Sequence, residues 1–325
     1  MNIGKIGILT SGGDSPGMNA AIRAVVRTAS YYCVNCIGIS LGYKGLINNE
    51  MRKVVPTDVN NLIHRGGTLL KTARSEEFKT KFGRKKANIN YKKNGLEGLI
   101  VIGGDGSFTG AMIFGQEYNI PIIGIPGTID NDIYGTDFTV GYDTALNTAI
   151  EAIDKIRDTA KSHNRLFFIE VMGKDSGFLA LNSGIATGAL DILIPEKKYN
   201  LDKLFYSIEK VKQKGKYSSI IIVSEGKKLG GVYDLAKTTK KKFPDYDIRV
   251  SILGHIQRGG YPTCSDRVLA SRLGVASVEA LISGKKNVMT GIKANKVIFT
   301  PFLKAIKKKR KIDIDLIKIS DIIAC

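Results

Sequence analysis

Gly124-Ile-Pro-Gly-Thr-Ile-Asp-Asn-Asp132 is the stretch around which the rest of the chain is organised. The largely apolar run Ile120–Ile125 predicts a strand, and Pro126-Gly127 predicts a tight turn in which glycine lets another group approach the backbone. Asp130 and Asp132 follow, so we expect two carboxylates just beyond the carboxyl end of a strand, which is where open α/β sheets bind ligands. An isolated pair of aspartates in a turn is more often simply solvated, so the other motifs decide between the two interpretations.

Two more predicted strands are followed by glycine-rich turns. Ile6–Thr10 leads into Ser11–Asn19, and Gly98–Ile102 leads into Gly103–Ser107. A turn of this kind between a strand and a helix presents backbone N–H groups and a positive helix end to phosphate, although the first turn matches neither the P-loop nor the dinucleotide fingerprint. The second turn also contains Asp105, and Mg²⁺ is commonly held by one or two carboxylates together with substrate phosphates.

Hydrophobic patterning predicts further elements along the chain. Helices are expected over 20–27, 108–118, 145–161, 201–214 and 265–282, strands over 36–39, 166–171, 192–196, 219–223 and 248–253, and a turn over 42–45. The polar segment Thr136–Thr144 is expected to be a crossing between domains. Alternation of strands and helices predicts an α/β fold with largely parallel sheets.

Charged residues follow many of these strands. They are Asp14, Asp105, Asp130, Asp132, Lys174, Glu225, His255 and Arg258. Loops at the carboxyl ends of parallel strands meet at one edge of a sheet. Carboxylates, glycines and arginines gathered there favour phosphoryl transfer, which depends on positioning, Mg²⁺ and cationic stabilisation of the transferring group. An alcohol acceptor would need one carboxylate to take its proton, and Asp130 and Asp132 are the natural pair.

The composition is that of a globular chain. Its 325 residues are 43% hydrophobic, include no run of eighteen apolar residues, and suggest two domains. Four scattered cysteines and no signal-peptide pattern lead us to expect a cytoplasmic location. The net charge of +19 suits nucleic acid as well as phosphorylated small molecules. Because the lysines are dispersed and no aromatic platform accompanies them, we favour phosphate ligands over a specific nucleic acid or a membrane.

Three motifs are specific enough to suggest a family. Pro126-Gly-Thr-Ile-Asp-Asn-Asp132, Val171-Met-Gly173 and Gly254-His-Ile-Gln-Arg-Gly-Gly260 resemble those of ATP-dependent 6-phosphofructokinase of the bacterial type. The resemblance extends from Ile6 to Arg272, nearly the whole chain. It implies transfer of the γ-phosphoryl group of MgATP to the 1-hydroxyl of fructose 6-phosphate, giving fructose 1,6-bisphosphate and ADP, the committed step of glycolysis.

The resemblance also implies roles at matching positions. Asp130 would be the general base, Thr128 and Asp132 would assist it, and Arg74 would stabilise the transferring phosphoryl group. Asp105 and Asp132 would hold Mg²⁺. ATP would be framed by Gly13, Arg74, Ser75, Gly104, Asp105, Gly106 and Ser107.

Fructose 6-phosphate would bind a larger set. The implied residues are Thr128, Ile129, Asp130, Met172, Gly173, Lys174, Glu225, His255, Ile256, Gln257 and Arg258. Arg165 and Arg249 would reach its 6-phosphate from a neighbouring subunit, a task for which the planar, permanently charged guanidinium is suited. The family is typically a homotetramer, which we therefore expect here.

The size of the residues at positions 106 and 127 predicts whether the phosphoryl donor is ATP or pyrophosphate. In pyrophosphate-dependent relatives the position of Gly106 is usually Asp and that of Gly127 is usually Lys. An Asp would crowd and repel the α-phosphate, and a Lys would fill the space that a nucleotide needs. Glycine at both positions therefore favours ATP, with a pyrophosphate-dependent enzyme, and more distantly a basic nucleic-acid-binding protein, as the alternatives.

The chain departs from the family pattern at several positions. Lys174 stands where Arg is usual. Lysine keeps the positive charge but lacks the planar, forked set of N–H donors of a guanidinium group. At the family's site for ADP or phosphoenolpyruvate, the matching residues are Arg23, Arg27, Arg157, Lys214 and Lys216. Pro56 replaces an Arg there, Leu190 replaces a metal-holding acid beside Asp191, and Tyr217-Ser218 replaces Lys-His. We therefore expect weakened or altered allosteric control.

The family fold implies two discontinuous, Rossmann-like α/β/α domains with the active site in the cleft between them. Residues 1–140 and 256–304 would form the ATP-binding domain. Residues 141–255 and 305–325 would form the fructose 6-phosphate-binding domain.

Overall fold

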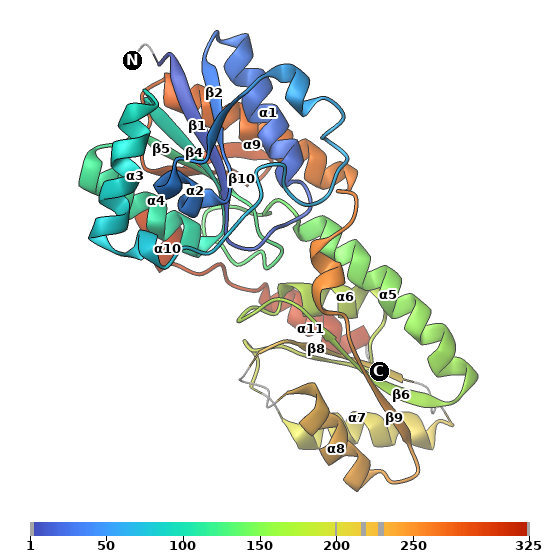
Figure 1. Cartoon of the computed structure of the whole chain (residues 1–325). Helices are drawn as coiled ribbons and strands as arrows, with labels where there is room; N and C mark the ends of the chain where they lie inside the picture. The colour runs from blue at the N-terminus through green and yellow to red at the C-terminus, as the bar shows by residue number, and fades with distance from the viewer. Residues whose placement is uncertain (1–2, 199, 216–218, 227–230, 324–325) are drawn as a thin grey trace. The chain divides into compact units, whose positions relative to one another are not determined.

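The computed structural model describes residues 3–198, 200–215, 219–226 and 231–323. Its contacts divide the chain into two compact units (Figure 1). Unit 1 comprises Met1–Ile129, Ile133–Thr144 and Arg258–Arg310, and unit 2 comprises Asp130–Asp132, Ala145–Gln257 and Lys311–Cys325. None of the helices in the described ranges has the length and apolar character needed to span a membrane.

Unit 1 is built on a seven-stranded sheet with the order β11-β10-β5-β4-β1-β2-β3. The strands are β1 (Lys5–Ser11), β2 (Asn35–Ile39), β3 (Met51–Val54), β4 (Gly98–Gly103), β5 (Ile122–Pro126), β10 (Val288–Lys293) and β11 (Lys296–Pro301). Pairing is parallel from β2 to β10, and the two edge strands β3 and β11 pair antiparallel with their neighbours. The prediction of an α/β fold with largely parallel sheets is confirmed.

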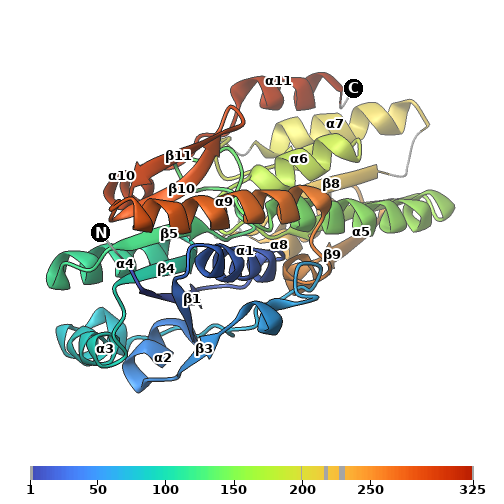
Figure 2. The same cartoon turned by 90° about the horizontal axis from the view of Figure 1, so that it is seen from above.

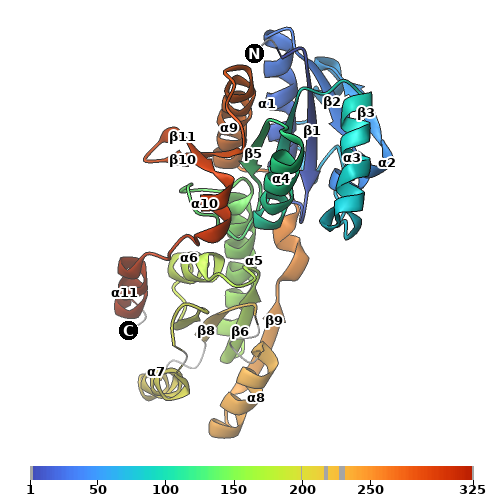
Figure 3. The ribbon, with the colours of Figure 1, turned by 90° about the vertical axis from the view of Figure 1, so that its left-hand side faces the viewer.

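Helices cover both faces of this sheet (Figures 2 and 3). One face carries α1 (Met18–Tyr31) and α9 (Cys264–Ile282), and the other carries α2 (Gly42–Asn48), α3 (Lys81–Lys93), α4 (Asp105–Tyr118) and α10 (Phe302–Lys307). Side chains of β4 alternate between the two layers, because Ile100 and Ile102 pack with α1 and α9 while Leu99 and Val101 pack with the others. A strand buried on both faces explains the continuous apolar run in the sequence.

The strand order places a topological switch between β1 and β4. The chain goes from β1 to β2 on one side and later returns to β4 on the other, with Ser11 paired to Gly103 at the last position. Open α/β sheets bind ligands beyond the carboxyl ends of the strands at such a point. The glycine-rich turns after β1 and β4 both begin here.

Unit 2 contains a parallel four-stranded sheet with the order β7-β8-β6-β9. The strands are β6 (Arg165–Val171), β7 (Asp191–Leu193), β8 (Ser219–Ser224) and β9 (Asp247–Ile252). Helices α7 (Leu201–Gln213) and α8 (Val232–Lys242) pack on one face, while α5 (Tyr142–Ser162) and α6 (Phe178–Ala186) lie on the other (Figure 3). Helix α11 (Ile314–Ile323) packs beside α6.

One predicted local structure is wrong. Gly42–Gly45 was expected to be a turn, but it begins helix α2. Leu41 and Gly42 both have positive φ, so the change of direction occurs at the helix start. A Cβ on Gly45 would overlap the carbonyl oxygen of Ser40, so this glycine permits a close backbone approach within a helix.

Asp266 joins the starts of two helices in unit 1. Its carboxylate accepts hydrogen bonds from the N–H of Gly141 (2.7 Å) and from the N–H (2.8 Å) and hydroxyl of Thr144, at the beginning of α5. Its own N–H donates to Thr263 Oγ1 (3.3 Å), the N-cap of α9. The first N–H groups of a helix have no partner within the helix, and Asp266 supplies the acceptor that these groups of α5 need.

The Asp266 carboxyl predicts a pH-dependent stability. Burial, with a smaller contribution from Asp143, raises its pKa to about 6, against the opposing hydrogen bonds from Thr144 and Gly141. The stability that follows from this raised pKa is present below the unfolded pKa of about 4 and is lost as pH rises through about 6. Relative to Asp266→Asn, the wild type should therefore lose up to about 3 kcal/mol between pH 4 and pH 8. Urea unfolding of both proteins across this range measures the difference, and parallel curves would contradict it.

Candidate active site

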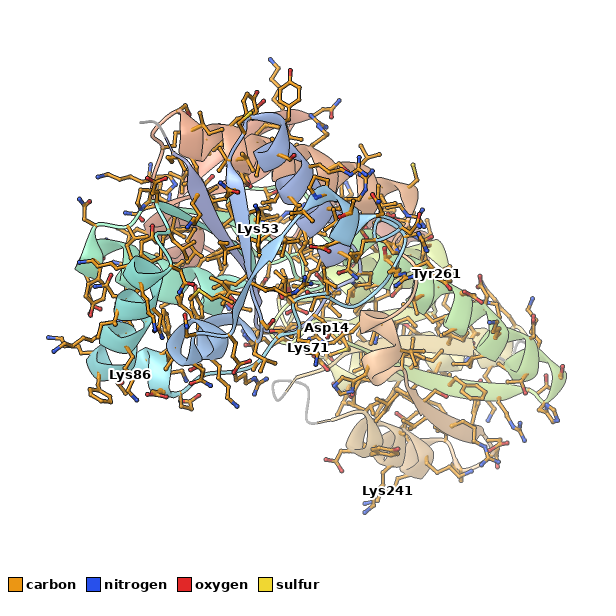
Figure 4. The ribbon with its side chains drawn as sticks, turned by 45° about the horizontal axis from the view of Figure 1, so that its top comes forward. Asp14, Lys53, Lys71, Lys86, Lys241 and Tyr261 are labelled. Atoms are coloured by element: carbon orange, nitrogen blue, oxygen red, sulfur yellow. The ribbon has the colours of Figure 1, made fainter. Side chains whose placement is uncertain are left out.

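The turn after β1 is held against a neighbouring loop and an arginine of unit 1. The Thr72 hydroxyl donates to the Gly12 carbonyl (2.8 Å), and the Thr10 hydroxyl donates to the Lys71 carbonyl (2.8 Å). Figure 4 marks Asp14 and Lys71 on these two segments. The loop that carries Arg74 and Ser75 is thereby fixed beside the turn. Arg74 is exposed, while Ser75 Oγ accepts from the N–H of Phe78 (3.2 Å) in the short 3₁₀ helix Glu77–Lys79.

Arg258 lies directly over the same turn. Its Nη1 donates to the Asp14 carbonyl (3.1 Å), and a Cβ on Gly13 would lie 2.6 Å from that nitrogen. The absence of a side chain at Gly13 therefore lets the guanidinium approach the backbone. Unit 1 thus brings together Gly13, predicted for ATP, and Arg258, predicted for the sugar phosphate.

The turn after β4 leads directly into α4, whose N-cap is Gly104. Ser107 is buried and its hydroxyl donates to the Ser11 carbonyl (3.0 Å), which ties this turn to β1. Asp105 and Gly106 are exposed, and no atom lies within 4 Å of a Cβ built on Gly106. A helix start with an exposed carboxylate and open space in front of it is suited to a phosphate chain and its cation.

The turn after β5 is buried and tightly bonded. The Gly127 N–H donates to the Gly103 carbonyl (3.1 Å), and a Cβ at Gly127 would lie 3.0 Å from Ile102 Cγ2 and 3.1 Å from Met18 Cε. Thr128 is half-buried, and its carbonyl accepts from the Thr139 hydroxyl (2.6 Å). Ile129, predicted to contact the sugar phosphate, is fully buried in the structure.

The two carboxylates that follow belong to unit 2. Asp130 and Asp132 are half-buried, while Asn131 between them is buried with φ of 53°. The Ser176 hydroxyl donates to the Asp130 carbonyl (2.9 Å). Asparagine tolerates this left-handed conformation better than most residues, so it is suited to this position.

Unit 2 also orients the turns after β6 and β8. Glu225 Oε1 accepts from the N–H groups of Gly173 (3.3 Å) and Lys174 (2.9 Å). Gly173 has φ of 145°, and a Cβ there would lie 2.5 Å from the Ser176 carbonyl oxygen. Glycine is therefore required at this position. Lys174, at φ of 55°, extends an exposed side chain from the same turn.

Gln257 holds backbone rather than projecting outward. Its side chain is fully buried, with Oε1 accepting from the Met172 N–H (3.3 Å) and Nε2 donating to the Gly254 carbonyl (3.0 Å). Met172 is also buried, whereas His255 and Ile256 are exposed. Gln257 therefore sets the position of its neighbours.

Arg165 and Arg249 meet at one carboxylate of unit 2. They lie on the adjacent strands β6 and β9, and Asp247 accepts from Arg165 Nε (2.6 Å) and pairs with Arg249 Nε (2.9 Å). The hydrogen bond from Arg165, then that from Arg249, lowers the pKa of Asp247. The two arginines predicted to share a phosphate thus both pair with the Asp247 carboxylate.

The predicted effector residues fall on three helices. Arg23 and Arg27 lie one turn apart on α1 of unit 1, and Arg27 donates to Asn60 Oδ1 (2.8 Å). In unit 2, Arg157 on α5 donates to the Thr187 carbonyl, and Lys214 is exposed at the end of α7. Lys216 and Tyr217-Ser218 lie outside the described residues.

The two departures noted at the effector positions have clear local structures. Pro56 begins a 3₁₀ helix, and Leu190 is buried with its N–H bonded to the Ile220 carbonyl (2.8 Å). Burial raises the pKa of the neighbouring Asp191, whose Oδ1 accepts from the Ile192 N–H. Burial thus disfavours the ionised form of the carboxyl that lies next to Leu190.

Carboxylates that could hold a cation are few at these turns within the described residues. Within them, no three or more His, Cys, Asp or Glu side chains are grouped as a metal site. Mg²⁺ bound mainly through substrate phosphates needs only one or two carboxylates. Asp105, exposed at the start of α4, fits that requirement, and its Oδ1 accepts only a local bond from the Gly106 N–H (2.7 Å) in the described contacts.

Comparison with known proteins decides the family. Residues 5–281 match the family model described as Phosphofructokinase. The chain belongs to the phosphofructokinase family. It is 54% identical over 314 residues to a protein of Bacteroides thetaiotaomicron named ATP-dependent 6-phosphofructokinase 2, covering 97% of this chain and 96% of that one. It is 51% identical over 320 residues to the ATP-dependent 6-phosphofructokinase 1 of Thermus thermophilus, covering 98% and 99%.

A solved structure gives the same result. The phosphofructokinase from Saccharomyces cerevisiae matches with a TM-score of 0.89 and 39% identity over 93% of this chain. The chain spans 45% of the length of that yeast chain. The family resemblance inferred from the three sequence motifs is therefore confirmed.

Several residues that shape these turns of the phosphofructokinase were not singled out from the sequence. Ser176, Val140, Asp247 and Asp266 act through the backbone or through other side chains. Asp247 had a visible signal, because it is two residues before Arg249 on a strand and so shares its face. The sequence carried no signal for the contacts of Asp266 with Gly141 and Thr144, since those two partners lie more than a hundred residues away.

Proposed function

We propose that this phosphofructokinase transfers the γ-phosphoryl group of MgATP to the 1-hydroxyl of fructose 6-phosphate, giving fructose 1,6-bisphosphate and ADP. The observation that carries the proposal is the buried turn after β5, which continues into Asp130 and Asp132, in a chain 54% identical to a relative named for this reaction. The turn supplies a positioned carboxylate, as proton transfer from an alcohol requires.

Unit 1 takes the donor in this proposal. ATP lies along the turns after β1 and β4, framed by Gly13, Gly104 and Gly106, with Arg74 and Ser75 on the adjoining loop. N–H groups at the start of α4 hold phosphate oxygens. Asp105 and Asp132 would hold Mg²⁺, which would supply positive charge beside the transferring group. The exposed position and permanent charge of Arg74 suit it to stabilising the transferring phosphoryl group.

Unit 2 takes the acceptor. Asp130 accepts the proton of the 1-hydroxyl while its backbone is held by Ser176, and the positioned carboxylate raises the nucleophilicity of the attacking oxygen. The unit 2 residues proposed to contact the sugar phosphate are Met172, Gly173, Lys174, Glu225, His255, Ile256 and Gln257. Because Gln257 and Ile129 are buried, they support the site through the backbone.

The 6-phosphate of the sugar is bound by Arg165 and Arg249 of a neighbouring subunit in a homotetramer. Support comes from their pairing with Asp247, which keeps two guanidinium groups together on adjacent strands. Each guanidinium group can donate two parallel hydrogen bonds to the oxygens of a phosphate. A cytoplasmic location follows from the reaction proposed.

ATP is the proposed donor in preference to pyrophosphate. Gly106 leaves open space, and Gly127 has Ile102 and Met18 at contact distance, so a lysine at 127 would have to displace both. The named relatives at 51–54% identity carry the ATP-dependent name. Both observations favour a nucleotide.

Asp130→Asn should lower kcat by at least about 100-fold, because an amide cannot accept the proton of the alcohol. The measurement is a coupled assay of ADP release with fructose 6-phosphate and MgATP. The bond from Ser176 is retained in this variant, since it goes to the Asp130 backbone carbonyl.

Asp154→Asn is the matched control, because it makes the same chemical change on the exposed side of α5. It should retain wild-type kcat. An Asp130→Asn enzyme within a few-fold of wild type would exclude Asp130 as the base. Light scattering on the same samples should give the mass of a tetramer, and a monomer would remove the shared phosphate site.

Gly106→Asp should reduce kcat/KM for MgATP at least about tenfold without loss of stability. The new carboxylate has space, and an acid in the first turn of α4 is favourable to the helix, but it repels the nucleotide phosphates. Steady-state kinetics with MgATP, alongside thermal unfolding, measure both effects.

Gly95→Asp is the control for added charge. Gly95 is exposed just before the amino end of β4, at the opposite edge of the sheet. This variant should keep wild-type kcat/KM. If Gly106→Asp also kept it, the nucleotide would not approach the start of α4.

A further inference from the structure

A short segment of unit 1, residues 139–144, runs beside the turn after β5, and we call it the strap. The N–H of Val140 donates to the Pro126 carbonyl (2.8 Å), and the N–H of Thr128 donates to the Val140 carbonyl (3.2 Å). The Thr139 hydroxyl adds a bond to the Thr128 carbonyl (2.6 Å). The backbone of Thr128, two residues before Asp130, is therefore fixed by the strap at both its N–H and its carbonyl.

The strap is in turn held by Asp266. This side chain is 1% exposed and accepts from Gly141, next to Val140, and twice from Thr144 at the end of the strap. Thr144 Oγ1 also accepts from the Thr263 N–H (3.0 Å), which ties the same point to the start of α9. One buried carboxylate thus fixes the strap to α9.

On its other side the strap is packed against the turn after β1. A Cβ on Gly141 would lie 2.5 Å from Ser15 Cβ, and one on Gly17 would lie 2.8 Å from Val140 Cγ1. Both glycines have φ of 102°. There is no room for even a methyl group, so a displacement of the strap is transmitted to its neighbours.

We propose that Asp266 is a positioning residue for phosphoryl transfer, which sets the backbone of Thr128, and through the chain that of Asp130, by holding Gly141 and Thr144 of the strap. The inference rests on the function proposed above. Asp266 touches neither substrate. Asp266 affects the rate through the position of Asp130, because catalytic groups must be held to within a fraction of an ångström of their productive position.

The chemistry of the carboxylate explains why an amide cannot replace it. Asp266 accepts from two backbone N–H groups and one hydroxyl. The amide of Asn has a single acceptor oxygen, and its NH₂ group can only donate. Asp266→Asn therefore leaves one strap N–H without an acceptor. The loss of this buried hydrogen bond allows the strap to move.

The test compares paired variants in the fructose 6-phosphate and MgATP assay. Asp266→Asn and Thr144→Val should each lower kcat about tenfold or more, because each removes a bond that holds the strap beside the Thr128 backbone. Thr144→Ser keeps the hydroxyl and should restore wild-type kcat. The double variant should be no slower than Asp266→Asn, since both changes break one network.

Ser277→Ala is the matched control for stability. Ser277 lies on the same helix as Asp266, is fully buried, and donates to the Leu273 carbonyl (2.7 Å) away from the strap. It should lower the thermal midpoint without lowering kcat. Equal kcat in Thr144→Val and Thr144→Ser, or a loss in Ser277→Ala that matches Asp266→Asn, would overturn the positioning role.

The outcomes also separate the two proposals. A wild-type protein without turnover on fructose 6-phosphate and MgATP removes the proposed function, and the role of Asp266 falls with it. A wild-type protein with turnover, together with an Asp266→Asn enzyme of unchanged kcat, removes the positioning role alone. If Asp266→Asn does not fold, the Thr144→Val and Thr144→Ser pair decides.

Discussion

The parallel pairing of β1 with β4 is the constraint on which unit 1 depends. It ends at Ser11 and Gly103, where a Cβ on Gly103 would overlap the Ser11 carbonyl and lie 2.5 Å from Ser107 Oγ. This close approach places two glycine-rich turns side by side at the switch point of the sheet, and the Ser107 hydroxyl joins them. Backbone packing thus forms the edge at which we propose that phosphate binds, and Asp105 and Gly106 are exposed there.

The central parallel strands could be predicted because both their faces are buried. Strands β4 and β5 are continuous apolar runs, which a surface element would not tolerate. Helix α3 was missed because its sequence, KFGRKKANINYKK, has little apolar periodicity. It is stabilised instead by the Thr80 cap and by the ion pair of Arg84 with Glu117 (2.6 Å). Strand β3 is short and half-polar, and only its antiparallel pairing with β2 defines it.

The candidate site could be predicted where its residues are neighbours in the sequence and form a motif. Motifs such as Pro126–Asp132 and Gly254–Gly260 state residue types and spacing together, so they identified the family and named the turns. Support from distant residues was not predictable, because Asp266 meets Gly141 across 125 positions and Asp247 gathers two arginines from neighbouring strands. Gln257 shows the converse: its motif suggested a ligand contact, while its buried amide joins the backbones of Met172 and Gly254.

The proposed reaction centres on the buried turn that leads into Asp130, with a donor side built for a nucleotide. A donor competition tests it most directly. The protein is mixed with fructose 6-phosphate, Mg²⁺ and equimolar ATP and pyrophosphate, and the reaction is followed by phosphorus NMR. We expect loss of the ATP γ signal, growth of ADP and of a new sugar phosphate at carbon 1, and an unchanged pyrophosphate signal. Consumption of pyrophosphate in place of ATP, or phosphate transfer to any position other than carbon 1, would contradict the proposed reaction.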